Sequence, residues 1–470
     1  MNLNNLTIIT AKEGLKTKQF SAVELLQAHL DSIEKQNKNL NAFLTVCKAE
    51  ALEQAKQADK LISEDQDLPL LGIPIGLKDI FMTKGIKTTA ASNVLKDYIP
   101  QYDGTVTSKL KNAGAVIVGK TNLDAWAHGS SGENSDFGST KNPWNPEYVP
   151  GGSSSGSAVS VAAGMAIAST GTDTGGSIRL PASFTNTVGL KPTYGRVSRY
   201  GIIAMASSLD SVGHFTKTVE DSAYFLGITA GKDENDSTTP NVEVTNYLKD
   251  LDKGVKGLKI GIPQEYFIEG LDKKIKGEVD KAIKFYEEQG AEIVNISLPN
   301  TEYAIATYYI IQPAEVSSNL ARYDGIRFGN GREEFGEEAK RRIMLGTFTL
   351  SVGYYDAYYK KAMKVRTLLM KDFEEAFKKV DAIIAPVSPT MPWKLGAKVN
   401  DPLAMYLSDI FAAPINLAGI PGLSIPIGFV DGLPVGMQIL GPHFSESLLF
   451  RIGHSYEKAH KWYERTPNGL

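Results

Sequence analysis

Two turns rich in glycine and serine, at residues 151–157 and 171–177, carry the side chains best suited to chemistry. From the first turn to Leu180 only Asp173 and Arg179 are charged, and the stretch between the turns reads as an apolar helix followed by an apolar strand. Glycine permits positive φ and close backbone approach, and successive N–H groups in such turns form an anion-binding nest. The pattern favours an oxyanion hole, and hence attack of a serine on an amide carbonyl.

Other interpretations of these turns explain less of the pattern. A flexible linker would not carry an apolar helix and strand, and a phosphate-binding loop of the GxxxxGK[ST] or GxGxxG type is absent. Gly152-Ser-Ser-Ser-Gly156 matches G-x-S-x-G, which would make Ser154 a nucleophile on a strand–turn–helix elbow, but a proline-broken loop precedes it. That elbow also needs a histidine, and the candidates have no distinctive setting: His214, His443, His454 and His460.

A lysine is the alternative base, because burial can lower its pKa enough to leave the amine neutral. Lys78 is the best candidate, since the apolar run at residues 71–77 would carry it into the interior. A buried lysine needs polar partners, which serine hydroxyls would supply. The single cysteine, Cys47, lies far from both turns and is expected to be structural, so a cysteine nucleophile is not expected.

The overall composition excludes several classes of protein. The chain has 50 basic and 53 acidic residues, so it lacks the charge surplus of a nucleic-acid-binding protein. One cysteine cannot form a disulfide framework. The first seven residues do not read as a signal peptide, and no apolar run reaches the roughly 20 residues that span a bilayer. We therefore expect a soluble, cytoplasmic enzyme.

The elements that must position these residues change in character along the chain. Residues 1–66 are expected to be helical, with a capping box at Ser21 and Glu24 and a helix-forming stretch at 48–61. Beyond them strand-like runs alternate with helical patterns, which predicts an α/β sheet. Strands are expected at 72–77, 115–118, 166–170, 258–262, 292–296, 381–385, 423–427 and 435–439, and helices at 106–113, 158–165, 274–289, 302–320, 337–379 and 445–461. No linker or repeat divides the chain, so we expect one domain over residues 1–470, with the helical segment packed on an α/β core of residues 67–470.

Three motifs resemble the amidase signature family: Gly72-Ile-Pro-Ile-Gly-Leu-Lys-Asp79, Pro150-Gly-Gly-Ser-Ser-Ser-Gly-Ser157 and Asp173-Thr-Gly-Gly-Ser-Ile-Arg179. The combination is highly specific, and the resemblance covers nearly the whole chain. Within the family, further stretches are most similar to the A subunits of tRNA-dependent amidotransferases, at residues 191–201, 206–210, 341–347, 353–359 and 405–409. The resemblance implies the amidase-signature fold, a central mixed β-sheet covered by helices.

The resemblance also implies a catalytic triad of Lys78, Ser153 and Ser177. Ser177 is then expected to attack the side-chain amide of glutamine. Ser153, which follows a non-proline cis peptide, would pass the proton to neutral Lys78 and back to the leaving ammonia. The oxyanion would be held by backbone N–H groups, those of Thr174, Gly175 and Gly176.

A glutamine pocket and a set of partners follow from the same resemblance. Arg342 is expected to bind the α-carboxylate, and Asp409 the α-ammonium with Tyr308 beside it. The ammonia would pass to a B subunit, which holds most of the tRNA and uses ATP and magnesium to convert Glu-tRNA(Gln) to Gln-tRNA(Gln). A small C subunit would complete a heterotrimer, and this chain itself would need neither metal nor cofactor.

Three features depart from the pattern of the family. Ser155 replaces a glycine in the first turn, His128 stands where methionine is usual, and the loop at residues 329–334 is short. Two other functions remain to be tested: a free-standing amidase acting on another small amide, and a non-catalytic scaffold. The pair Arg342 and Asp409 favours a glutamine-hydrolysing subunit over the first, and the complete triad argues against the second.

Overall fold

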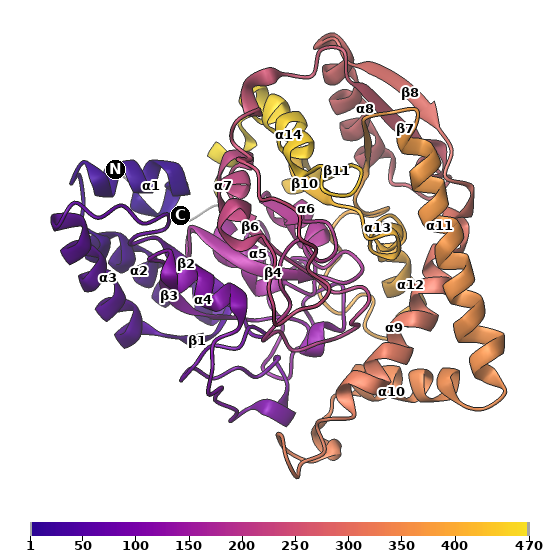
Figure 1. Cartoon of the computed structure of the whole chain (residues 1–470), viewed down its shortest axis with the longest axis horizontal. Helices are drawn as coiled ribbons and strands as arrows, with labels where there is room; N and C mark the ends of the chain where they lie inside the picture. Colours follow the sequence, from indigo (N-terminus) through magenta and orange to yellow (C-terminus); the bar gives the residue numbers. More distant parts are fainter. Residues whose placement is uncertain (1, 468–470) are drawn as a thin grey trace.

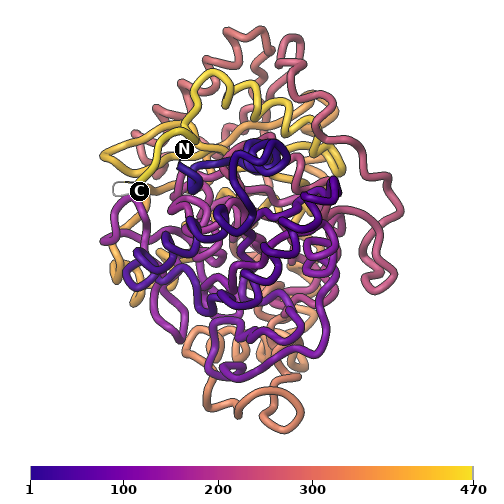
Figure 2. Tube along the Cα trace, turned by 90° about the vertical axis from the view of Figure 1, so that its left-hand side faces the viewer, coloured from indigo at the N-terminus to yellow at the C-terminus, as the bar shows by residue number. Residues whose placement is uncertain are grey.

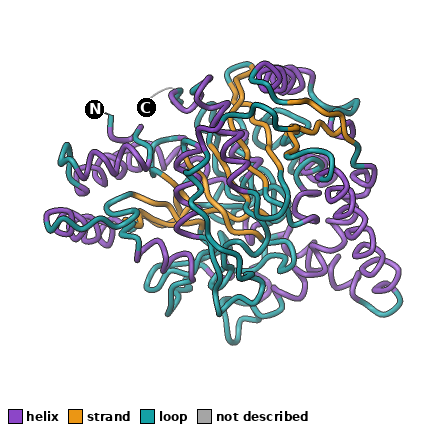
Figure 3. Tube along the Cα trace, turned by 45° about the horizontal axis from the view of Figure 1, so that its top comes forward, coloured by secondary structure: helices purple, strands orange, loops and turns teal. Residues whose placement is uncertain are grey.

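A computed structural model describes residues 2–467, and its centre is a single mixed β-sheet (Figures 1 and 3). The described strands follow the order β1-β3-β2-β4-β6-β5-β10-β11-β9-β7-β8. Their bounds are β1 Phe43–Val46, β2 Pro74–Lys78, β3 Val116–Thr121, β4 Ala168–Asp173, β5 Val188–Lys191, β6 Ser211–Thr216, β7 Lys259–Pro263, β8 Glu292–Ile296, β9 Ala382–Pro386, β10 Gly422–Val430 and β11 Leu433–Leu440. The predicted α/β fold with a central mixed sheet is thus confirmed.

Helices surround this sheet (Figure 3). Their bounds are α1 Ile8–Lys16, α2 Ala22–Leu40, α3 Lys48–Ser63, α4 Thr105–Asn112, α5 Ser155–Ala162, α6 Arg179–Thr185, α7 Val219–Thr229, α8 Lys273–Glu288, α9 Ala304–Leu320, α10 Glu337–Leu350, α11 Lys361–Phe377, α12 Pro402–Tyr406, α13 Ala413–Ala418 and α14 Glu446–His460. Helices α9–α11 lie on the side of the molecule away from α1–α3 (Figure 1). None of the helices in residues 2–467 combines the length and apolar character that crossing a bilayer requires.

The N-terminal segment is more than helical. The capping box of Ser21 and Glu24 opens α2 as expected, and Asn41 ends that helix in the left-handed conformation. The next residues, Phe43–Val46, then form β1 and pair antiparallel with β3. The prediction of a wholly helical segment is therefore wrong at this point, because an aromatic and β-branched run finds a free sheet edge once the helix has ended. Figure 2 shows this indigo segment in front of the magenta part of the chain.

The two faces of the sheet are covered by different helices. Phe215 of β6 packs against Ala158 of α5 and against Ile178, the residue just before α6. The ring of the neighbouring His214 packs on Phe225 of α7. Because successive side chains of a strand point to opposite faces, α5 and α6 cover one face and α7 the other. Both turns of interest adjoin the helices of the first face.

The sheet topology brings polar side chains at the ends of two strands close together. Strand β2 lies between β3 and β4 and runs parallel to both. Parallel strands place their carboxyl ends at the same edge of a sheet, so Lys78 at the end of β2 and Asp173 at the end of β4 meet there. The second glycine-rich turn follows Asp173 directly.

Candidate active site

The side chain of Lys78 lies at the centre of a cluster of hydroxyl groups. Its backbone N–H donates to Thr170 Oγ1 at 3.0 Å, which fixes the end of β2 against β4. Its Nζ donates to Ser153 Oγ at 2.9 Å, to Ser154 Oγ at 2.8 Å and to Thr172 Oγ1 at 2.8 Å. The number of acceptors matches the three N–H donors of an ammonium group. Lys78 has no exposed surface.

The environment of Lys78 makes the neutral amine accessible near neutral pH. Burial lowers the pKa of this lysine to about 7, although the carboxylates of Asp124, Asp173 and Asp210 act in the opposite direction. Desolvation penalises the charged form, and nearby carboxylates offset only part of that penalty. Lys78 can therefore exchange a proton with a hydroxyl near neutral pH, as a general base must.

Ser153 is held between Lys78 and Asp124. The peptide bond from Gly152 to Ser153 is cis, and the carbonyl of Ser153 accepts a hydrogen bond from the Asp124 N–H at 3.2 Å. A Cβ on Gly152 would collide with the Asp124 carboxylate, so only glycine fits this position. Burial raises the pKa of Asp124 to about 7, even though the N–H groups of Asn134 and Gly132 donate to it.

Ser154 holds the first turn in place against β4. Its hydroxyl accepts from Lys78 and donates to the carbonyl of Thr172 at 3.1 Å, whose N–H donates back at 3.3 Å. His214 lies within β6 and bonds to Ser222 at 2.8 Å. The hydroxyl of Ser154 is thus occupied in joining the first turn to β4, with no histidine bonded to it among residues 2–467, and the elbow interpretation has no support.

Ser177 lies in the second turn, next to the first. Its carbonyl accepts from the Ser154 N–H at 3.2 Å, so the two turns are hydrogen-bonded to each other. Ser177 is 8% exposed, whereas Ser153 and Lys78 have no exposed surface. Within residues 2–467 no hydrogen bond joins the hydroxyls of Ser177 and Ser153. The structure therefore brings the three predicted triad residues to one place, with Ser177 on the side open to a ligand.

The conformation of the second turn is set by the buried carboxylate of Asp173. Its oxygens accept from the N–H groups of Gly176 at 2.8 Å, Ile178 at 3.2 Å and Arg179 at 3.3 Å. Burial alone would raise the pKa of Asp173, but the Arg179 guanidinium, together with Lys191 and Asn416, outweighs it and brings the pKa to about 2. The carboxylate therefore stays ionised and acts as the internal anion around which the turn folds.

This arrangement changes the expected oxyanion hole. The N–H of Gly176 is occupied by Asp173 and is not free to bind a substrate oxygen. The N–H groups of Thr174 and Gly175 have no acceptor among the described residues, and the Thr174 hydroxyl is fixed by Asp210 at 2.7 Å. Of the three predicted oxyanion donors, the structure therefore leaves Thr174 and Gly175 free, because the side chain that shapes the turn takes the Gly176 N–H; their role in an oxyanion hole stays a prediction.

Arg342 is buried on α10, and only some of its N–H donors have a hydrogen-bond partner. Its Nε donates to Glu338 Oε1 at 2.8 Å and its Nη1 to Gln312 Oε1 at 2.9 Å. The guanidinium also lies over the rings of Tyr309 and Tyr406, at 5.5 and 5.7 Å from their centroids. Its Nη2 has no acceptor in residues 2–467, which leaves one side of the guanidinium for a ligand.

Asp409 lies close to the second turn. Its Oδ1 is 4.0 Å from the position that a Cβ would take on Gly176, and its carboxylate accepts from Ser130 Oγ at 2.8 Å and from Tyr309 Oη at 3.0 Å. Burial raises the pKa of Asp409 to about 6, despite these donors. The residue bonded to Asp409 is thus Tyr309, whereas the ring of Tyr308 packs against Gly175.

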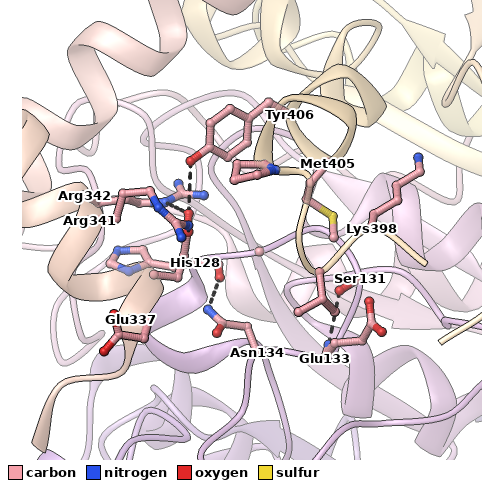
Figure 4. A pocket seen from close by; sticks show the side chains of 14 residues that line it. His128, Ser131, Glu133, Asn134, Glu337, Arg341, Arg342, Lys398, Met405 and Tyr406 are labelled. Carbon is pink, nitrogen blue, oxygen red and sulfur yellow. Dashed lines mark hydrogen bonds and ion pairs between the residues drawn. The ribbon is translucent and has the colours of Figure 1, made fainter. Parts of the chain in front are cut away.

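A cavity of about 170 Å³ opens beside Arg342 (Figure 4). Its walls come from residues 128–134, from the start of α10 and from the segment that includes α12. His128 and Arg342 come from two of these segments and lie beside each other in the lining. Within residues 2–467 no group of three or more His, Cys, Asp or Glu side chains is placed to hold a metal ion.

The structure accommodates two of the three departures from the family pattern, Ser155 and the short loop at residues 329–334, through hydrogen bonds. Ser155 is the first residue of α5, it lies outside the positive-φ region, and its hydroxyl donates to Thr140 at 3.1 Å. A serine is therefore unstrained at this position. The short loop at residues 329–334 lies against residue Val94, whose carbonyl accepts from the Asn330 N–H at 2.6 Å.

Four residues that contact Arg342 or Asp409 were not predicted from the sequence: Ser130, Gln312, Tyr309 and Glu338. Ser130 and Gln312 carry no local pattern that marks them. Tyr309 adjoins the predicted Tyr308, and Glu338 lies one helical turn before Arg342, which is a signal that an i, i+4 search for ion pairs could have used.

Comparison with known proteins identifies the class of enzyme. The Amidase family model matches residues 24–450. The chain is 54% identical over 479 residues to the A subunit of glutamyl-tRNA(Gln) amidotransferase from Geobacter sp. (strain M21), covering 98% of this chain and 99% of that protein. It therefore belongs to the amidase family, whose members in solved structures include amidase signature enzymes.

Two solved structures show how far the likeness extends. The crystal structure of the A subunit of glutamyl-tRNA(Gln) amidotransferase from Thermotoga maritima superposes with a TM-score of 0.85 at 43% identity, covering 97% of this chain and 95% of that one. The native peptide amidase from Stenotrophomonas maltophilia gives a TM-score of 0.85 at 30% identity, covering 98% of both chains. The fold thus supports enzymes that act on different amides.

Proposed function

We propose that this chain is the glutamine-hydrolysing subunit of a tRNA-dependent amidotransferase. The observation that carries the proposal is the buried Lys78 amine, which contacts three hydroxyl groups and has a pKa near 7. A second observation supports a preference for an amino-acid amide: Asp409 lies beside the same turn, and both Asp409 and Arg342 are buried charged groups. The names of the relatives described above support the same function.

The proposed reaction proceeds through a covalent intermediate. The Ser177 oxygen attacks the side-chain carbonyl carbon of glutamine, while its proton passes through Ser153 to Lys78. The N–H groups of Thr174 and Gly175 stabilise the tetrahedral oxyanion. When the C–N bond breaks, the proton returns from Lys78 through Ser153 to the leaving ammonia. Water then hydrolyses the γ-glutamyl ester, which releases glutamate and restores the Ser177 hydroxyl.

The substrate is selected by charge at its α-carbon. The free side of the Arg342 guanidinium binds the α-carboxylate, since guanidinium and carboxylate form strong charge-assisted hydrogen bonds. Asp409 binds the α-ammonium, and Tyr308 closes the pocket against Gly175. A clamp for both charged groups has no use in an enzyme for simple amides, which favours glutamine over the free-standing amidase alternative.

The ammonia is consumed by partner subunits. A B subunit holds the misacylated tRNA and uses ATP and magnesium to activate its glutamate, and a C subunit joins the two. The near-neutral charge of this chain, with 50 basic and 53 acidic residues, is consistent with tRNA being bound mainly elsewhere.

Ammonia release tests this proposal directly. The purified chain, alone and with its partner subunits, is incubated with glutamine and with several unrelated amides. The expected result is release from glutamine that the partners and an acceptor tRNA increase. Hydrolysis of unrelated amides without hydrolysis of glutamine would establish the free-standing amidase instead, and no hydrolysis at all would support the scaffold.

A substitution of Arg342 tests the clamp. Arg342→Ala should raise the KM for glutamine by about 10- to 100-fold, since a hydrogen bond to a charged group contributes roughly 1.5–3 kcal/mol. Lys340→Ala is the matched control, because Lys340 lies on the same helix, is partly exposed and does not line the cavity, although it pairs with Glu337 at the cavity rim. An unchanged KM in the Arg342 variant would place the carboxylate anchor elsewhere.

A further inference from the structure

The imidazole of His128 has two buried nitrogen atoms without a partner. The residue has no exposed surface, and neither Nδ1 nor Nε2 has a hydrogen-bond partner among the described residues. Buried polar atoms normally have partners, because leaving them unpaired is costly. A histidine in this condition indicates a missing polar partner, such as a bound ligand.

The ring is held in its position by the backbone around it. The His128 N–H donates to the carbonyl of Ala125 at 2.9 Å, and its own carbonyl accepts from Asn134 Nδ2 at 2.7 Å. Two residues further on, Ser130 donates to Asp409. The segment that carries His128 is therefore fixed to the residue proposed to bind the α-ammonium, and the ring is preorganised.

A cavity of about 170 Å³ lies next to His128. Both His128 and Arg342 line it, and Figure 4 shows the imidazole beside the arginine. Arg342 keeps its Nη2 without an acceptor in residues 2–467, so both side chains bring unused donors to the lining of one cavity. Donors gathered in this way suit an anion with two oxygens, such as a carboxylate.

The protonation state of His128 is suited to this role. Burial lowers its pKa well below the ordinary value, and the charge of Arg342 lowers it further. A neutral imidazole keeps one N–H donor and does not repel the guanidinium. Two positive charges in the lining of one cavity would be costly without a ligand, whereas a neutral donor beside a cation is not.

We propose that His128 is a specificity-determining residue that binds the α-carboxylate of glutamine together with Arg342. One ring N–H of His128 donates to one carboxylate oxygen, and Arg342 Nη2 donates to the other. The inference rests on the proposed function, since it assumes that the amide donor is an α-amino acid. It adds a contact that depends on the carboxylate and not on the amide.

A comparison of two substrates tests it. Glutamine and 4-aminobutanamide carry the same kind of amide and an amine at the corresponding carbon, but only glutamine has the α-carboxylate. In His128→Phe, the KM for glutamine should rise about tenfold or more at similar kcat, since one hydrogen bond to a charged group is lost. The kcat/KM for 4-aminobutanamide should stay within about twofold. His128→Gln keeps an N–H donor and should restore part of the glutamine affinity.

Controls separate this role from a structural one. His443→Phe makes the same chemical change at an exposed histidine away from the cavity and should leave both substrates unaffected. The melting temperature of His128→Phe should be unchanged or higher, because the substitution removes two unpaired buried nitrogens. Equal losses on both substrates, or a large fall in melting temperature, would overturn the proposal in favour of a structural role.

The two proposals fail in distinguishable ways. If the wild-type complex hydrolyses glutamine and His128→Phe does so with the same KM, only the assignment of His128 is wrong. If the wild-type complex releases no ammonia from glutamine but hydrolyses other amides, the proposed function is wrong, and the assignment of His128 is wrong with it.

Discussion

The pH dependence of glutamine hydrolysis follows from the state of Lys78. Its pKa is about 7 instead of 10.5, and catalysis requires the neutral amine. The neutral fraction of a group with this pKa is about 9% at pH 6 and about 91% at pH 8, so kcat should rise about tenfold over this interval and then level off. A lysine with an ordinary pKa would instead give a rise of about a hundredfold without a plateau.

Steady-state ammonia release from about pH 5.5 to about pH 9.5 measures the difference. The plateau should appear in kcat, because Lys78 acts in the bound complex. The KM should rise separately at low pH, since protonation of Asp409, whose pKa is about 6, removes the partner of the α-ammonium. Lys78→Arg, which stays protonated, should be inactive throughout the range. A kcat that continues to rise tenfold per pH unit above about pH 8 would refute the assignment of Lys78 as a buried neutral base.

Further consequences concern the second turn. Arg179→Met removes the partner of the buried Asp173 and should lower the free energy of unfolding by about 3–5 kcal/mol, measured by chemical denaturation; a loss below about 1 kcal/mol would mean that the pair does not hold the turn. Gly175→Ala places a Cβ 2.6 Å from the ring of Tyr308, so we expect a cost of about 1–3 kcal/mol and a fall in kcat/KM of at least about tenfold. Gly227→Ala, where an added Cβ meets nothing within 4 Å, is the control and should be neutral or stabilising; full activity of the Gly175 variant would show that the turn is not part of the pocket.

The sequence predicted the strands with a recognisable apolar pattern, and it missed β1, β5 and β6. Residues 72–77, 258–262 and 423–427 are expected strands that correspond to β2, β7 and β10. The sequence of β6, Ser-Val-Gly-His-Phe-Thr, mixes polar and apolar residues, and it becomes a strand through pairing with β4 and β5 on either side. Such pairing joins residues far apart in the chain, which local patterns do not encode.

The candidate site was predictable to a similar extent. Its two glycine-rich turns and Lys78 are visible as local patterns, since each depends on a short stretch of chain. The loss of the Gly176 donor to Asp173 is not visible, because it depends on how the turn folds around its own carboxylate. The contact of Asp409 with Tyr309 depends on packing between segments about 100 residues apart.

The central claim is that Ser177 forms a covalent ester with glutamine. Rapid quenching of the enzyme during turnover, followed by digestion and mass spectrometry, locates the γ-glutamyl group. We predict an adduct on the peptide that contains Ser177, its loss in Ser177→Ala, and its retention on Ser177 in Ser154→Ala. An adduct on Ser154, or full ammonia release by Ser177→Ala, would contradict it.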